Sequence, residues 1–216
     1  MRVGVLGLQG AFADHHVAVA AALARLGLVG ESVDVRRPEA LAAVDGLIIP
    51  GGESTTISKL LDRFELRDAL LTRAREEDFP ILGTCAGLVL LSSEGDEQVA
   101  KTDTHLLGLM DMATDRNAFG RQKESFEADL TLIGFEGTVP GVFIRAPAIR
   151  TTWGACEPLG SIDTPHGPRA VAARQGNRLA IAFHPELTGD TRVHEKFLNI
   201  VTEWRQGTCA CGRQEF

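Results

Sequence analysis

The sequence lacks the features that mark nucleic-acid-binding, membrane and secreted proteins. Its 22 Lys and Arg against 29 Asp and Glu give a net charge of −7 with no basic block, which argues against a nucleic-acid surface. No apolar run is long enough to span a membrane. Residues 1–6 read directly as a strand, without the charged, apolar and cleavage regions of a signal peptide. These absences predict a cytoplasmic protein that binds neither nucleic acid nor membrane.

Tyrosine is absent, which we attribute to genome composition, and cysteine is scarce. The cysteines form no disulfide framework, so we expect free thiols in a reducing compartment: Cys85, Cys156, Cys209 and Cys211. The last two form a lone Cys-x-Cys that could bind a metal. A disordered tail fits this segment better, because no companion cysteine or histidine pair is present. We therefore predict no metal site.

Internal repeats, low-complexity linkers and a convincing domain boundary are absent as well. A chain of 216 residues, 44% of them hydrophobic, suits one globular domain with a sizeable core. We place this domain at residues 1–205 and expect residues 206–216 to form a flexible tail.

Short apolar segments alternate with amphipathic segments through the first part of the chain. Strands are expected at residues 2–8, 32–36, 47–49 and 81–82. The first helix would bury one face and end at Gly27 or Gly30; that face comprises Phe12, His16, Val19, Leu23 and Leu26. His15 and His16 diverge around this helix, so we assign the pair no metal site. Ser54 is expected to cap the next helix.

After Gly95 the pattern changes to successive strands at residues 129–133, 141–144, 148–153, 169–175 and 178–183. Gly176-Asn177 predicts a turn that pairs the last two strands antiparallel. A closing helix follows. The whole pattern predicts a single three-layer α/β domain of flavodoxin-like type. Its central sheet would be mainly parallel, with helices on both faces and an antiparallel extension.

The pentapeptide Gly83-Thr84-Cys85-Ala86-Gly87 is the most informative segment. It lies between two apolar runs and reads as strand, sharp turn and helix, with a thiol at the turn. This is the cysteine form of the Gly-x-nucleophile-x-Gly elbow, where a helix N-terminus favours a thiolate and a developing oxyanion. A buried structural cysteine is the alternative, and the flanking glycines argue against it. Cys85 is therefore our candidate nucleophile.

A candidate base follows the apolar run at residues 179–183. His184 stands where that strand is expected to end, and residues two apart on an extended chain point to the same side. Glu186 could therefore hold the imidazole in the correct tautomer while His184 takes the thiol proton. The fold must bring this segment to Cys85.

Further segments occur in a definite order along the chain. They are Leu8-Gln9-Gly10-Ala11, Pro50-Gly51-Gly52-Glu53-Ser54-Thr55-Thr56, the run at residues 116–122 followed by Ser125-Phe126-Glu127, Phe143-Ile144-Arg145-Ala146-Pro147 and Phe183-His184-Pro185-Glu186-Leu187. Together with the elbow, they resemble class I (triad-type) glutamine amidotransferases. Within that class they resemble the glutaminase subunits of pyridoxal 5′-phosphate synthase complexes, over about residues 1–205.

The resemblance implies hydrolysis of L-glutamine to L-glutamate and ammonia. Cys85 would form a γ-glutamyl thioester, His184 would transfer the protons, and Glu186 would orient His184. Backbone N–H groups of Ala86 and of the Gly51-Gly52 loop would hold the oxyanion. The glutamine pocket would comprise Gly52, Glu53, Ser54, Arg116, Ile144 and Arg145. Without the resemblance, Arg116 and Arg145 would read as solvated surface residues, and Glu53 as a first-turn helix acid.

The resemblance also implies a partner. Glutaminases of this family pass ammonia through an internal channel to a (β/α)₈-barrel synthase subunit, in a complex of twelve synthase and twelve glutaminase subunits. Pyridoxal phosphate is made by the partner, so no cofactor is expected in this chain. Gln9 is a candidate for coupling partner docking to the oxyanion loop.

Two other interpretations stay open. The chain could supply ammonia to a different synthase, such as an imidazole-glycerol-phosphate or aminodeoxychorismate enzyme, although the Gly-Gly-Glu-Ser-Thr-Thr loop argues against this. It could also be a non-catalytic interaction module on the same scaffold, although the intact Cys85, His184 and Glu186 argue against that. A cysteine peptidase or stress-response protein that shares the elbow is a more distant third.

Overall fold

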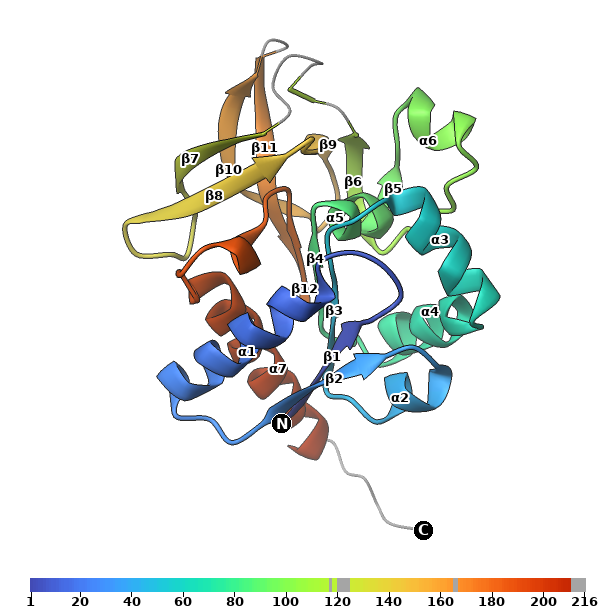
Figure 1. Ribbon diagram of the computed structural model, residues 1–216, viewed down its shortest axis with the longest axis vertical. Helices are drawn as coiled ribbons and strands as arrows, with labels where there is room; N and C mark the ends of the chain where they lie inside the picture. Colours follow the sequence, from blue (N-terminus) through green and yellow to red (C-terminus); the bar gives the residue numbers. More distant parts are fainter. Residues whose placement is uncertain (117, 120–124, 165–166, 211–216) are drawn as a thin grey trace.

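The structure of the chain, a computed structural model, describes residues 1–116, 118–119, 125–164 and 167–210 (Figure 1). A ten-stranded mixed sheet forms its centre. Helices lie on both sides of the parallel half of this sheet, and a separate two-stranded hairpin lies beside the antiparallel half (Figure 1). The predicted α/β domain with an antiparallel extension is confirmed.

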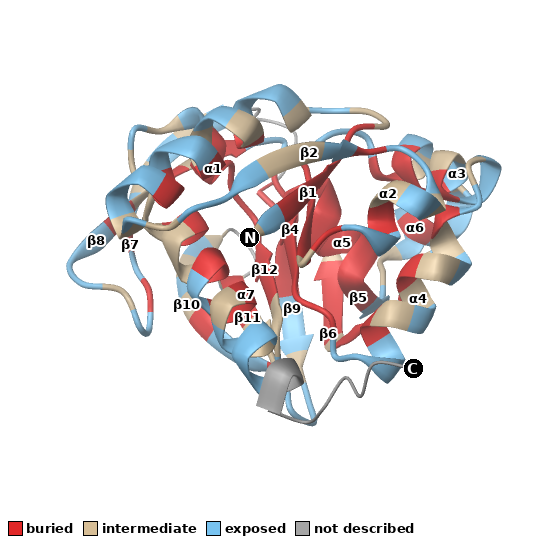
Figure 2. Cartoon of the chain, turned by 90° about the horizontal axis from the view of Figure 1, so that it is seen from below, coloured by how far each residue is buried: buried red, intermediate tan, exposed pale blue. Residues whose placement is uncertain are grey.

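The parallel half of the sheet positions the candidate site. It comprises, in spatial order, β2 (Glu31–Val35), β1 (Arg2–Leu6), β3 (Gly46–Ile49), β4 (Ile81–Thr84) and β12 (Arg178–Ile181). Every residue of β3 and β4 is buried, as expected for strands covered on both faces (Figure 2). Because the carboxyl ends of β3, β4 and β12 lie at one edge, the segments that follow these strands meet there.

The antiparallel half continues the sheet beyond β12. The strands that follow are β11 (Gly167–Gln175), β9 (Ala148–Thr152), β6 (Met110–Asp115) and β5 (Ser92–Glu94), while β10 (Glu157–Thr164) pairs with β11. These pairs are antiparallel except for β5 and β6, which run parallel. β7 (Ser125–Thr131) and β8 (Thr138–Ile144) form the separate hairpin. The predicted turn at Gly176-Asn177 is confirmed, since Gln175 pairs antiparallel with Arg178 across it.

The helices form the outer layers. α1 (Phe12–Leu26) packs against α7 (Arg192–Ala210). α3 (Ser54–Arg63) contacts both α4 (Leu66–Glu76) and α5 (Ala86–Leu91), and α4 also contacts α2 (Pro38–Ala42). The remaining elements are α6 (Glu97–Lys101) and a 3₁₀ turn, η1 (Pro185–Leu187). Gly27, in the left-handed conformation with φ 63°, ends α1, as one of the two predicted stops.

The buried face of α1 differs from the prediction at one position. The fully buried stripe contains His15, Val19, Ala22 and Leu23, a helical spacing that includes His15 in place of His16. Phe12 and Leu26 are only partly buried at its margins. Sequence reasoning placed the wrong histidine inward, because a histidine has no strong hydrophobic signal and adjacent positions lie about 100° apart around a helix.

Three strands were not predicted: β5, β6 and β10. β10 contains Pro158 and Gly160, which weaken a strand pattern, and its pairing with β11 is irregular at these positions. At the other end of the chain, α7 extends to Ala210, beyond the predicted domain limit at residue 205. The remainder of the predicted tail, residues 211–216, lies outside the described residues.

Candidate active site

Cys85 stands at the junction between β4 and α5, with φ 48° and ψ −103°. Its backbone N–H donates to the carbonyl oxygen of Ile181 at 2.8 Å, which ties the turn to the end of β12. Glycine is required at position 87, because a Cβ there would lie 2.2 Å from the carbonyl oxygen of Ile49. The strand–turn–helix geometry expected of the elbow is therefore present.

His184 and Glu186 lie side by side, with His184 Nδ1 2.7 Å from Glu186 Oε1. The backbone between them is not the extended strand end that we predicted. β12 ends at Ile181, and the 3₁₀ turn η1, which begins at Pro185, brings the two side chains together. The backbone N–H of His184 donates to the carbonyl oxygen of Val142 at 2.8 Å and so anchors this segment to β8.

The imidazole of His184 connects the thiol to the carboxylate, and both His184 and Glu186 are buried. Burial alone would lower the pKa of His184, but hydrogen bonds with Cys85 and Glu186 raise this pKa to about 10. The two motifs that lie far apart in the sequence thus meet in space.

The Gly51-Gly52 loop packs between the imidazole and the start of α1. A Cβ on Gly51 would lie 2.3 Å from His184 Cε1, so only glycine allows this approach. The Ala11 N–H donates to the Gly51 carbonyl oxygen at 3.0 Å, and Gln9 Oε1 accepts from the Glu53 N–H at 2.9 Å. The segment after β1 therefore holds the loop from one side.

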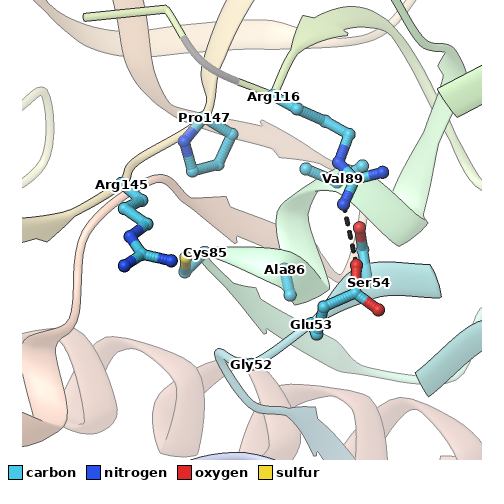
Figure 3. A pocket seen from close by; sticks show the side chains of 9 residues that line it. All are labelled: Gly52, Glu53, Ser54, Cys85, Ala86, Val89, Arg116, Arg145 and Pro147. Carbon is cyan, nitrogen blue, oxygen red and sulfur yellow. Dashed lines mark hydrogen bonds and ion pairs between the residues drawn. The ribbon is translucent and has the colours of Figure 1, made fainter. Parts of the chain in front are cut away.

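A cavity of about 440 Å³ opens over the thiol (Figure 3). Its lining residues come from the loop before α3, the elbow, the end of β6 and the segment after β8: Gly52, Glu53, Ser54, Cys85, Ala86, Val89, Arg116, Arg145 and Pro147. Seven of these nine were predicted as site residues. Val89 and Pro147 were missed, although Val89 lies one helical turn after Ala86 and Pro147 belongs to the quoted Arg145 motif.

Residues 5–203 of the chain match the SNO glutamine amidotransferase family. The chain belongs to this family. Its relatives include the proteins named pyridoxal 5′-phosphate synthase subunit PdxT of Archaeoglobus fulgidus and Methanococcoides burtonii. They are 51% and 48% identical to it, over 93% and 92% of this chain and 98% of each relative. The predicted family is therefore confirmed, and with it an enzyme of the amidotransferase class.

A solved structure agrees with the SNO family assignment. A crystal structure described as a glutamine amidotransferase is 43% identical and superposes with a TM-score of 0.80, over 93% of this chain and 98% of the other. A glutamine amidotransferase from Thermotoga maritima has a TM-score of 0.57 at 12% identity, over 95% of this chain and 85% of the other. The second likeness shows that the fold is shared at low identity.

Glu53 and Arg116 form a pair at the rim of the cavity, with Arg116 Nη2 2.8 Å from Glu53 Oε1. The predicted cap was wrong: Glu53 is the N-cap of α3, and Ser54 is its first residue. Desolvation opposes ionisation of Glu53, but hydrogen bonds from the N–H groups of Thr55 and Thr56 prevail and lower its pKa to about 2. A longer acidic side chain here performs the role that the sequence suggested for serine.

Arg145 also lines the cavity, and its φ of 43° is unusual for a residue with a side chain. No described residue forms a hydrogen bond or ion pair with its guanidinium. Ile144, predicted as a pocket residue, ends β8 with 40% of its surface exposed and does not line the cavity. Of the run at residues 116–122, positions 117 and 120–122 lie outside the described residues.

In the part of the chain that the structure describes, no group of three or more His, Cys, Asp and Glu is arranged to hold a metal ion. No described helix is both long enough and apolar enough to cross a membrane.

Proposed function

We propose that this chain hydrolyses L-glutamine to L-glutamate and ammonia, as the glutaminase subunit of a pyridoxal 5′-phosphate synthase. The observation that carries the proposal is the connected Cys85, His184 and Glu186 beneath a cavity that Glu53, Arg116 and Arg145 help to line. The relatives named PdxT support the same pathway.

The chemistry begins with attack of the Cys85 sulfur on the side-chain amide carbon of glutamine. His184 holds the thiol proton and transfers it to the departing nitrogen, so that ammonia leaves and a γ-glutamyl thioester remains. His184 then takes a proton from water, whose oxygen attacks the thioester, and returns it to the cysteine sulfur as glutamate leaves. The raised pKa of His184 favours a protonated imidazole at the start of this sequence. Glu186 orients the ring through Nδ1.

The oxyanion would be stabilised by backbone N–H groups of Gly52 and Ala86. The Gly51 carbonyl is hydrogen-bonded to Ala11 on the side of α1. In a trans peptide the N–H points opposite to the C=O, so the Gly52 N–H is directed away from Ala11. This orientation supports a role for the Gly51-Gly52 peptide as an oxyanion donor. Gln9, which accepts from the Glu53 N–H, would keep the loop in this orientation.

The two ends of the pocket suit the two charges on the glutamine α-carbon. Arg145, which has no partner among the described residues, would bind the α-carboxylate. Glu53 would accept from the α-ammonium group, held in place by Arg116. Gly52 and Ser54 would complete the contacts from the loop.

The released ammonia requires an acceptor close at hand. We propose a cytoplasmic complex in which a (β/α)₈-barrel synthase receives ammonia through an internal channel, with twelve copies of each of the two chains. Ammonia is largely protonated at neutral pH, and a channel prevents its loss to solvent.

The deciding experiment is glutamate release by the purified chain, alone and with a barrel synthase, with Cys85→Ala as the control. We expect strong stimulation by the synthase and complete loss of glutamate release in Cys85→Ala. Activity that depends on Cys85 but not on this synthase would contradict the pathway and favour a glutaminase for another synthase. If Cys85 fails to react with an electrophilic glutamine analogue even in the complex, the chain is a non-catalytic module.

A further inference from the structure

A second histidine lies behind Glu186, on the side away from His184. His15 of α1 is fully buried, and its Nε2 stands 3.5 Å from Glu186 Oε2. The same Nε2 lies 3.2 Å from the hydroxyl of Thr84, the residue before Cys85. On the other edge of the ring, His15 Nδ1 lies 3.0 Å from His194 Nε2 of α7. Four elements thus contribute to one buried polar cluster beside the candidate triad.

Glu186 has one well-bonded oxygen and one that lacks a partner. Oε1 bonds His184, whereas Oε2 is buried and has no hydrogen bond of standard geometry. An ionised carboxylate oxygen in that position needs a donor, because burying it without one costs far more than the same group in water. His15 Nε2 is positioned to supply this donor.

The ring nitrogens of the two histidines allow two proton arrangements. In one, His194 Nε2–H donates to His15 Nδ1, and His15 Nε2–H faces Glu186 Oε2 and the Thr84 hydroxyl. In the other, His15 donates to His194, the Thr84 hydroxyl donates to His15, and Glu186 Oε2 faces a lone pair. Only the first arrangement gives the carboxylate oxygen a donor. The need of Glu186 Oε2 for a donor therefore selects the first arrangement, in which His194 donates to His15.

We propose that His15 is a positioning residue that holds the second oxygen of Glu186 and thereby fixes the imidazole of His184 for proton transfer. This inference rests on the proposed glutaminase function. His15 does not line the cavity over the thiol, and it acts through Glu186.

The charge state of the cluster agrees with this role. Desolvation, together with the neighbouring His194, His184 and His16, places the pKa of His15 well below its ordinary value. Desolvation also lowers the pKa of His194 to about 4. With both imidazoles neutral, His194 can donate to His15 and His15 can donate to Glu186. Neither ring then carries a positive charge that would compete with His184 for the carboxylate.

The test compares two substitutions that differ by one methylene group. The amide nitrogen of His15→Gln can reach the position of Nε2 and donate to Glu186, whereas His15→Asn is too short to do so. His16→Asn is the matched control, since this adjacent histidine pairs with Ser32 and Asp34 away from the site. For each protein, in complex with the barrel synthase, kcat and KM for glutamine are measured. Thermal unfolding verifies the fold.

We expect His15→Gln to stay within about threefold of the unchanged protein. His15→Asn should lower kcat by about 10- to 100-fold at an unchanged KM, the range for losing one hydrogen bond to a charged group. The downfield proton resonance of the His184–Glu186 hydrogen bond should persist in His15→Gln and His16→Asn, and shift or broaden in His15→Asn.

Equal kcat values in His15→Gln and His15→Asn, whether both high or both low, would overturn the proposal. An unchanged downfield resonance in His15→Asn would overturn it as well. Failure of the proposed function is distinguishable from either result: the unchanged protein would then release no glutamate, while the proton resonance would still report whether His15 positions Glu186.

Discussion

The two sides of the candidate site differ in how far their carboxylates are exposed to solvent. On the catalytic side, Glu186 has a side chain with 0% exposure and lies among the ends of buried parallel strands. On the rim of the pocket, the Glu53 side chain is 48% exposed and bonds the N-terminus of α3 and Arg116. A buried carboxylate acts through fixed geometry, whereas an exposed one is screened by solvent. Substitutions on the catalytic side should therefore change rate, and those on the rim should change affinity and, slightly, stability.

The largest effect is expected for Glu186→Gln. The substitution keeps the shape of the side chain but removes the negative charge that orients His184. We therefore expect kcat to fall by about 10³- to 10⁴-fold, as in hydrolase triads that lose their carboxylate. The pKa of His184 should also fall from about 10, because one of the groups that raises it is lost. Steady-state kinetics and a nuclear magnetic resonance titration of His184 measure the two changes.

The matched control for Glu186→Gln is Glu195→Gln. Glu195 is also a mostly buried carboxylate near this end of the molecule, but it pairs with Arg25 at 2.9 Å rather than with a histidine of the site. Glu195→Gln should leave kcat unchanged. If Glu186→Gln retains kcat within tenfold of the unchanged protein, the burial of Glu186 does not translate into a catalytic role, and the contrast between the two sides fails.

An intermediate effect is expected at the rim for Arg145→Gln. Losing a charge-assisted contact to the α-carboxylate should raise KM for glutamine by about 10- to 100-fold, with kcat within about threefold. Glutamine bears the same backbone strain as arginine at this positive φ, so the fold should be unaffected. Arg150→Gln, which alters an arginine paired with Asp115, is the control. A lower kcat at unchanged KM would instead place Arg145 on the catalytic side.

The same comparison separates the features that could be predicted from the sequence from those that could not. The elbow and the positions of the parallel strands along the chain depend on local patterns, namely glycine spacing and apolar runs, and the structure reproduces them. The contacts that a residue makes with distant segments leave no such pattern. Nothing local showed that Glu53 rather than Ser54 would cap α3, or that a 3₁₀ turn would bring Glu186 to His184.

His15 is the clearest case of a residue whose environment is set by tertiary structure alone. Its neighbours Thr84, Glu186 and His194 lie between 69 and 179 residues away along the chain. Helical periodicity could have placed it on the buried stripe with Val19, but not beside a carboxylate of the candidate triad. The buried stripe of α1 follows from the sequence. The chemical environment of His15 within it arises only from the packing of α1 against η1 and α7.

The smallest effect is expected for Glu53→Gln, as a change in stability with pH. The pKa of Glu53 is lowered from 4.5 to about 2, so its ionised form stabilises the folded state above pH 4.5. This contribution should disappear as the pH falls from about 4.5 to about 2. Because the side chain is half exposed, solvent screening limits this contribution to less than about 1 kcal/mol, which corresponds to a Tm change of less than about 4 °C at neutral pH.

Thermal unfolding of the unchanged protein and Glu53→Gln between pH 7 and pH 2.5 measures this difference. Glu97→Gln, which removes an exposed carboxylate from the first turn of α6, gives the background for losing one negative charge. A Tm difference that stays constant across the whole pH range would mean that Glu53 stabilises α3 through its shape rather than its charge. A difference that closes with falling pH would show that the charge of this rim carboxylate, and not only its shape, stabilises the folded state.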